Sequence, residues 1–99
     1  METPELIPAT DFCASHQIDL SFISSLQEYG LIQVTIVEDN RFIPSPELVR
    51  LEQLVRMHYD LNINFEGLDA ILNLLGRVDA MQSEILSLHN RLRLYETGR

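Results

Sequence analysis

Apolar residues recur along this 99-residue chain with the three-to-four-residue spacing of helices, interrupted once by a run rich in β-branched residues. The spacing predicts a helix over residues 9–16, a tight turn at Gln17 and a second helix over 18–30. The β-branched run 31–37 and the shorter stretch 41–43 predict a β-hairpin, which is the only strand pair that we expect.

A third helix is predicted to begin at Ser45-Pro46, because proline suits the first turn of a helix, and to end near Asp60. Asn64 is typical of the residue that caps the start of a helix. Beyond it, apolar residues alternate steps of three and four, which is the heptad register of a coiled coil. Gly76 interrupts the helix propensity but not this register, whose positions are Ile71, Leu74, Val78, Met81, Ile85, Leu88, Leu92 and Tyr95.

These elements predict a mainly α protein in which residues 1–8 and 96–99 are flexible. Residues 9–75 form a helix-turn-helix domain with a β-hairpin wing, and residues 76–95 form a coiled-coil dimerisation helix. We expect one long helix through Gly76; two helices folded onto the domain are the alternative. The stripe beyond this glycine is too far from a small core to be covered by it. A homodimer is therefore expected, and the pattern does not decide between parallel and antiparallel pairing of its helices. The expected interface residues are Val78, Met81, Ile85, Leu88, Leu92 and Tyr95.

The distribution of charge adds a functional constraint. The chain has a formal net charge of −8, no lysine and seven arginines, none of which precedes Arg41. An acidic surface repels phosphate and attracts basic partners, although solubility alone accounts for many surface acids. The single cysteine, Cys13, excludes an internal disulfide and fits a reducing compartment, and no apolar run is long enough to cross a bilayer. We therefore expect a cytoplasmic protein without membrane contact.

The order of the elements over residues 6–95 resembles the MerR-type winged helix-turn-helix fold. Gly30-Leu31-Ile32 lies where that family has the glycine and two leucines that close its recognition helix. Ser45-Pro46-Glu47-Leu48 matches the acidic entry into its third helix, and Ile63-Asn64-Phe65-Glu66 matches the capped start of its fourth. The resemblance implies a coiled-coil helix after these elements, and MerR-like proteins suggest antiparallel pairing.

Within this superfamily the chain is most similar to the chaperone-modulator (CbpM) family. The similarity lies in Phe12-Cys13, in the glycine and two apolar residues after the second helix, in the segment 56–64 and in Gly67-Leu68. The resemblance implies binding to the J-domain of a DnaJ-like co-chaperone of the CbpA type. It also implies that this binding inhibits the co-chaperone's stimulation of a DnaK-type chaperone.

The second predicted helix departs from the DNA-binding members of the superfamily. Their recognition helix carries an arginine followed by tyrosines, whereas this chain has Ser24 at the arginine position and Glu28 near it. Basic contacts to phosphate supply most non-specific DNA affinity, and Arg41 in the wing is a single retained arginine. DNA is therefore an unlikely partner, and a MerR-type transcriptional regulator is kept as the alternative function. A structural dimerisation unit is a third hypothesis.

No phosphate-binding glycine loop, nucleophile motif or zinc-protease motif occurs, so we expect neither an enzyme nor a metal or cofactor. Cys13 and His16 have the spacing of two metal ligands, but no second pair completes a site. We interpret His58 as isolated and solvated. The candidates for partner binding are acidic and aromatic residues expected at the surface, namely Glu28, Asp39, Asp60, Glu66, Asp69, Tyr59 and Phe65.

Overall fold

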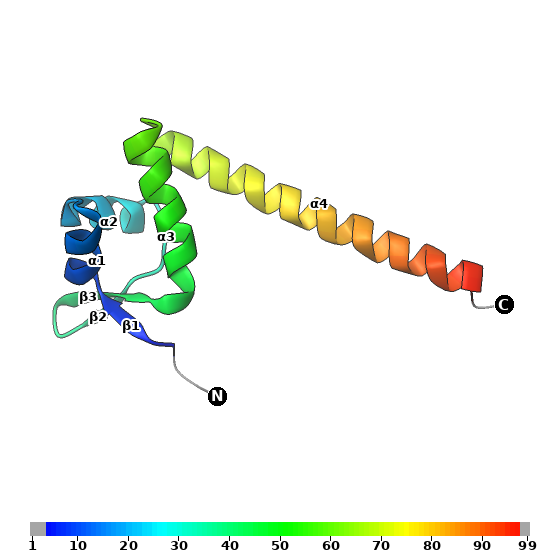
Figure 1. Ribbon diagram of the computed structural model, residues 1–99, viewed down its shortest axis with the longest axis horizontal. Coiled ribbons are helices and arrows are strands. Elements are labelled where there is room, and N and C mark those ends of the chain that lie inside the picture. The colour runs from blue at the N-terminus through cyan, green and yellow to red at the C-terminus, as the bar shows by residue number, and fades with distance from the viewer. Residues whose placement is uncertain (1–3, 98–99) are drawn as a thin grey trace. The chain divides into compact units, whose positions relative to one another are not determined.

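The computed structural model describes residues 4–97. Its contacts divide the chain into two compact units, Met1–Asp69 and Ala70–Arg99, each described here by itself. The described residues form a mainly α fold with a small sheet, which confirms the predicted class (Figure 1). In chain order the elements are β1 (Leu6–Pro8), α1 (Ala9–His16), α2 (Leu20–Glu28), β2 (Thr35–Val37), β3 (Asn40–Pro44), the 3₁₀ turn η1 (Ser45–Glu47), α3 (Leu48–Val55), the π-helical segment η2 (Arg56–Asp60) and α4 (Phe65–Thr97).

Helices α1 and α2 form the predicted helix-turn-helix. Gln17 ends α1 in the left-handed conformation, with a φ of 56°, and the amide of Ile18 donates to the carbonyl of Cys13. Asp19 then caps α2, because its Oδ1 accepts a hydrogen bond of 3.4 Å from the amide of Ser21. Side-chain caps of this kind satisfy an amide that has no partner within the helix.

Gly30 ends α2 as predicted, with a φ of 73°. Its amide donates to the carbonyl of Gln27, and the amide of Leu31 donates to that of Leu26 at 2.9 Å. This pair of bonds is the Schellman motif, which turns the chain back towards the core after a helix. Leu31 and Ile32 are consequently both buried.

The predicted strand 31–37 is wrong in its first half, because the observed strand β2 begins at Thr35. Two consecutive buried residues cannot both face the core from one regular strand, since successive side chains alternate between its faces. The amide of Gln33 also donates to Oε1 of Glu47 at 2.9 Å instead of to a neighbouring strand.

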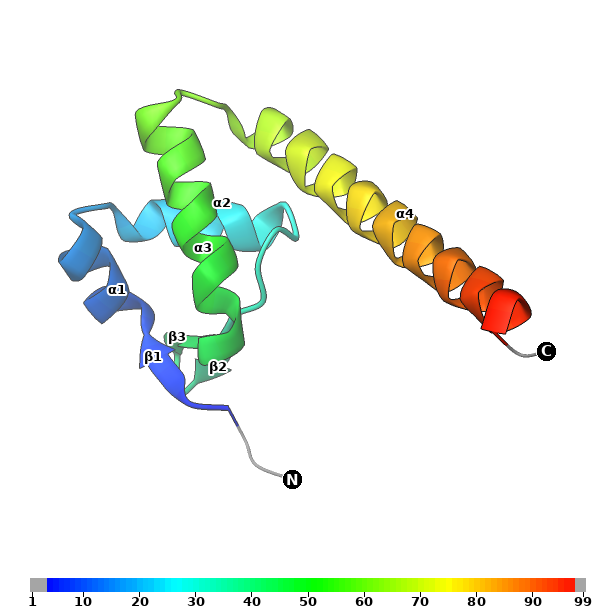
Figure 2. The ribbon, with the colours of Figure 1, turned by 45° about the vertical axis from the view of Figure 1, so that its right-hand side comes forward.

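The sheet has three antiparallel strands in the order β1-β3-β2, so the expectation of a single strand pair is wrong. Leu6–Pro8 pairs with β3, where Leu6 lies opposite Pro44, and this segment is therefore not the flexible lead that we predicted. Residues 1–3, which belong to the same prediction, lie outside the described residues. Figures 1 and 2 place all three strands together beside the start of α1.

The β2–β3 connection is a two-residue hairpin loop. Glu38 and Asp39 have φ values of 51° and 65°, and Val37 pairs with Asn40. Two positive φ values at the centre of a hairpin are typical of a type I′ turn, whose twist matches that of the flanking strands.

The third helical segment begins and ends with irregular turns. Ser45 opens the 3₁₀ turn η1 without a side-chain cap, and its amide donates to the carbonyl of Glu5 at 2.8 Å, so the sheet fixes this start. The segment ends at Asp60, as predicted, but its last five residues form the π-helical segment η2.

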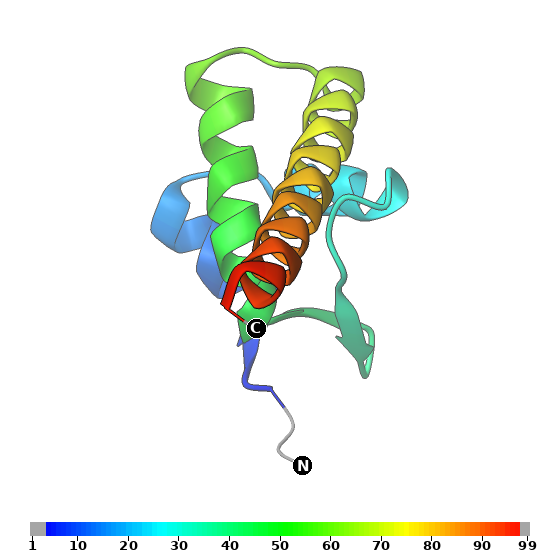
Figure 3. The same cartoon turned by 90° about the vertical axis from the view of Figure 1, so that its right-hand side faces the viewer.

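Asn64 caps α4 as predicted: its Oδ1 accepts a bond of 2.8 Å from the amide of Gly67. The helix then continues unbroken through Gly76 to Thr97, which confirms the prediction of one long helix (Figure 3). Residues 96–97 are therefore helical and not flexible, while residues 98–99 lie outside the described part.

The core of the first unit is formed by α1, α2, α3 and the first turn of α4, together with Ile43 of β3 and with Leu31 and Ile32 after α2. Figure 2 shows α2 crossing behind α3, and apolar side chains of both helices are fully buried. Leu68 is also 0% exposed, and the first compact unit ends directly after it, at Asp69. No helix within residues 4–97 is long and apolar enough to span a membrane.

Candidate functional site

Helix α2 is the element that enters the DNA major groove in helix-turn-helix proteins that bind DNA. Here it contains no lysine or arginine between Leu20 and Glu28, and its exposed polar residues are Ser21 and Glu28, at the two ends. The carboxylate of Asp19 lies at its first turn. This surface presents negative charge where phosphates would approach.

The wing supplies one arginine next to α2. Nε of Arg41 donates to Oε1 of Gln27 at 3.3 Å, and the arginine side chain is partly buried. The guanidinium is therefore held against α2, and Arg41 is the one arginine or lysine among residues 4–47 of the described chain.

The net charge of the protein lies in the first unit. Residues 1–69 contain twelve acidic residues and three arginines, whereas residues 70–99 contain three acidic residues and four arginines. A partner that recognises negative charge would therefore be attracted to the first unit and only weakly to residues 70–99.

Aromatic rings from α2, η2 and the start of α4 meet in one cluster. Phe22 is 3% exposed, and its ring centre lies 5.0 Å from that of His58, 5.2 Å from Tyr59 and 5.8 Å from Phe65. Such separations are typical of favourable ring pairs. The cluster fixes the start of α4 on the helix-turn-helix.

The outer edge of this cluster carries a carboxylate. Tyr29, which is 45% exposed, stacks on Phe65 with ring centres 5.5 Å apart, and its hydroxyl donates to Oε2 of Glu66 at 3.2 Å. The negative charge of Glu66, together with this hydrogen bond, raises the pKa of Tyr29. We call Tyr29, Tyr59, Phe65 and Glu66 the aromatic–acidic surface.

Two further contacts order this surface. His58 is half-buried, and its Nδ1–H donates to the carbonyl of Ile63 at 2.8 Å while its ring stacks on Phe65, so the interpretation of a solvated histidine is wrong. Tyr59 is 45% exposed; burial of part of its ring raises its pKa, and a hydrogen bond from the backbone of Asp19 opposes that shift.

Of the predicted partner-binding residues, the structure brings Tyr59 and Phe65 together around Phe22, while Glu66 is bound to Tyr29 next to Phe65. Sequence reasoning missed Tyr29, Phe22 and His58, because Phe22 meets His58, and Tyr29 meets Phe65, across more than thirty residues of sequence.

The other predicted acids are exposed but more dispersed. Glu28 adjoins Tyr29 and its charge contributes to the raised pKa of that tyrosine. Asp60 ends η2, and Asp69 lies one turn beyond Phe65 in α4. Asp39 lies in the hairpin turn instead, where it lines a separate hollow of about 380 Å³ with Leu20 and Arg41.

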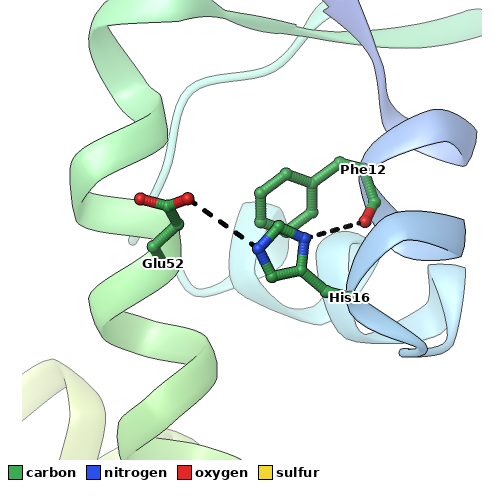
Figure 4. A network of polar contacts seen from close by, with 3 residues as sticks. All are labelled: Phe12, His16 and Glu52. Carbon is green, nitrogen blue, oxygen red and sulfur yellow. Dashed lines mark hydrogen bonds and ion pairs between the residues drawn. The ribbon is translucent and has the colours of Figure 1, made fainter.

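A second network joins α1 to α3 (Figure 4). The ring of His16 stacks on Phe12 at 4.0 Å, its Nδ1–H donates to the carbonyl of Phe12 at 3.1 Å, and its Nε2 lies 3.8 Å from Oε2 of Glu52. Cys13 beside it is buried. Burial raises the pKa of its thiol, and the negative charge of Asp19 raises it further by a smaller amount. These contacts give His16 and Cys13 packing roles.

Metal chemistry has no assembled site in the described part of the chain. Residues 4–97 contain no group of three histidine, cysteine or acidic side chains placed to hold a metal ion.

Helix α4 carries an uncovered apolar stripe within the second unit. The heptad residues from Leu74 onward are between 47% and 80% exposed, and Leu75, Leu86 and Leu94 are exposed outside this stripe. We call this set the α4 seam: Leu74, Val78, Met81, Ile85, Leu88, Leu92 and Tyr95.

Comparison with protein families finds a match to the model described as MerR HTH family regulatory protein, over residues 7–90. Comparison with curated proteins and comparison with solved structures each gave no match.

Proposed function

This chain belongs to the MerR family of helix-turn-helix regulatory proteins, and we propose that it regulates by binding protein instead of DNA. Specifically, it acts as a chaperone modulator of the CbpM type. It binds the J-domain of a DnaJ-like co-chaperone and inhibits that co-chaperone's stimulation of a DnaK-type chaperone.

The observation that carries the proposal is the chemistry of α2 and its surroundings. The helix that would read DNA has no basic side chain, and acidic groups stand at both of its ends. Affinity for DNA depends on lysine and arginine contacts to phosphate. A helix-turn-helix that has lost these contacts and kept a structured surface is suited to a basic protein partner.

The aromatic–acidic surface supports a basic helix as the partner. Tyr29 and Tyr59 expose rings over which a guanidinium or ammonium group can stack, and Glu66 provides a carboxylate beside Tyr29. J-domains present a basic face, so the two fields are complementary. Complementary charge speeds association and selects the partner.

The test is calorimetric titration of the purified J-domain into the full chain at low and at moderate salt. We expect binding that weakens as salt rises, because salt screens exposed charges. We also expect the double reversal Glu66→Lys with Asp69→Lys to weaken binding. The matched control is Glu5→Lys with Asp79→Lys, which changes the net charge equally away from this surface and should retain most of the affinity.

A functional readout accompanies the titration. The wild-type chain should suppress co-chaperone-stimulated ATP hydrolysis by the DnaK-type chaperone, and the double reversal should suppress it less. Absence of binding heat at both salts, with no suppression, would refute the chaperone-modulator function. Tight binding that is indifferent to salt would refute the electrostatic mechanism, and Phe65→Ala would then test an apolar anchor.

The family match itself favours a second function, a DNA-binding transcriptional regulator of the MerR type. A mobility-shift assay at low salt, with excess competitor DNA, separates the two functions. We expect no specific shifted band because of the charge around α2, and a specific shift would establish the regulator instead.

We also propose that the active form is a homodimer joined along the predicted residues Val78 to Tyr95. Their exposure on α4 supports this, since large exposed apolar stripes mark sites of association.

A further inference from the structure

The outer strand of the hairpin β2–β3 leaves one edge of the sheet uncovered. Among residues 4–97, β2 pairs with β3 alone, because the strand order is β1-β3-β2. Figure 3 shows the hairpin standing out from the helices of the first unit. We propose that the free edge of β2 binds an extended, basic segment of another protein, which joins the sheet as a fourth strand. This edge shares no residue with the aromatic–acidic surface, and its occupancy does not depend on J-domain binding.

The turn geometry identifies the main-chain groups of β2 that are open. Val37 and Asn40 flank the two-residue loop, and residues in these positions of a type I′ hairpin bond to each other through both main-chain groups. The next pair along the ladder, Ile36 and Arg41, directs its main-chain groups outward instead. Ile36 therefore turns its amide and its carbonyl towards the free edge. An added strand can exchange two hydrogen bonds with this one residue.

This edge also lacks the features that commonly block strand addition. Many proteins protect an edge strand with lysine, proline or a bulge. The opposite edge strand, β1, ends in Pro8, which has no amide hydrogen, whereas β2 consists of Thr35, Ile36 and Val37. Ile36 is 57% exposed and Val37 is 44% exposed, and successive side chains of a strand lie on opposite faces. An added strand therefore finds an apolar neighbour on each of its faces.

Charge determines which kind of segment fits this edge. Glu38 and Asp39 follow β2 directly, and both are exposed. Arg41 lies opposite Ile36 on β3, but its Nε donates to Oε1 of Gln27, so its guanidinium is directed towards α2 and away from the turn. Opposite charges on neighbouring strands stabilise their pairing and select the partner. The acidic end of β2 therefore favours lysine or arginine in the added segment.

A second copy of this chain is a poorer occupant of the edge. Residues 1–69 contain twelve acidic residues and three arginines, so two first units that approach one another closely repel each other. A segment of opposite charge meets no such repulsion, which favours a different protein as the partner.

Nuclear magnetic resonance of the full chain tests the site with a synthetic probe. The probe is a six-residue peptide with blocked ends, in which lysine and valine alternate, and it is titrated to millimolar concentration into isotope-labelled protein. We expect the amide signal of Ile36 to shift as the peptide binds and its hydrogen exchange to slow, because this amide gains a hydrogen bond. Binding of the peptide at another surface would shift other amides and leave Ile36 unchanged, which would overturn the proposal.

Two changes to the probe separate strand pairing from attraction by charge alone. N-methylation of the peptide amides keeps the charge but removes the hydrogen bonds, so the dissociation constant read at Ile36 should rise about fivefold or more. Replacing every lysine with glutamate keeps the alternating pattern but reverses the charge, and it should abolish the shift of Ile36. If the methylated peptide binds as tightly as the parent, strand addition is wrong; if the glutamate peptide does so, the basic partner is wrong.

Variants of the turn test the role of charge from the side of the protein. Glu38→Gln with Asp39→Asn removes both charges and keeps the side-chain shapes, and it should raise the dissociation constant of the lysine peptide about two- to tenfold. The matched control is Asp60→Asn with Asp79→Asn, which changes the net charge equally and should bind as the wild type does. An equal loss in both pairs would show that net charge alone attracts the peptide, which contradicts a site at β2.

The protein without peptide provides the last control. Its Ile36 signal should keep its position when the protein is diluted at constant salt. A shift on dilution would show that the edge is occupied by a second copy of the chain, which would overturn the assignment to another protein.

Discussion

Leu88 and Leu86 form a matched pair for testing whether the α4 seam joins two copies. Both are exposed leucines on the same helix, at 55% and 61% respectively, but only Leu88 occupies a seam position. We expect Leu88→Asp to dissociate the dimer and Leu86→Asp to leave it intact. Any general effect of a new carboxylate on helix propensity or net charge is common to both variants.

The expected size follows from the exposure of Leu88. Complete burial of a leucine is worth about 1.5–3 kcal/mol, so covering the exposed half contributes about 0.8–1.6 kcal/mol per copy. Loss of both copies raises the dissociation constant about 10- to 200-fold. The two aspartates would also lie unpaired in an apolar interface, which adds a desolvation cost and moves the effect to the upper end of that range.

Sedimentation equilibrium over a concentration series measures both dissociation constants. A dimer for wild type and for Leu86→Asp, with a monomer for Leu88→Asp at the same concentration, is the expected result. If Leu88→Asp keeps the wild-type mass at every concentration, the seam is not the interface between copies. Equal dissociation of both variants would show that the carboxylate acts through the helix itself, which would also contradict the reasoning.

Two further predictions concern single positions in the first unit and in α4. Gly30→Ala should destabilise the protein by about 1 kcal/mol, because alanine is strained at a φ of 73°. Gly76→Ala should instead stabilise α4 by about 1 kcal/mol, since its φ is helical and its surroundings are open. Urea unfolding measures the change in the free energy of unfolding for both variants, and changes of the same sign would contradict the backbone explanation. Glu66→Gln should lower the pKa of Tyr29 towards its ordinary value, because it removes the main cause of the upward shift. Ultraviolet titration of tyrosinate absorbance, compared with the wild type, measures this change. An unchanged titration curve would show that Glu66 does not raise the pKa of Tyr29.

Local signals in the sequence were sufficient for the helices and their ends. The bounds of α1, the stop at Gly30 and the cap at Asn64 each depend on residues within a few positions of one another. The capping and turn chemistry of such residues is intrinsic to short segments. The seam on α4 could also be predicted from the sequence, because its apolar residues repeat with the heptad period.

Features that depend on contacts between distant segments could not be predicted from local sequence signals. Strand β1 is three residues long and ends in proline, and its strand character arises from pairing with β3 more than thirty residues away. The aromatic–acidic surface likewise requires Tyr29 to meet Phe65 and Glu66 across the fold. Helical periodicity shows which residues face inward from one helix, but it contains no information about which rings meet between helices.

The distribution of charge and apolar surface separates the two proposed interactions physically. The first unit holds the excess of acidic residues and the aromatic–acidic surface, while residues 70–99 are nearly neutral and carry the seam. Contacts between exposed charges weaken as salt rises, whereas burial of apolar surface does not. Raising the salt should therefore release a basic partner from the first unit while the two copies stay joined through α4. A homodimer joined through α4 would carry one aromatic–acidic surface on each copy. Two such surfaces on one particle increase the effective affinity for any partner that offers two basic faces at a matching separation.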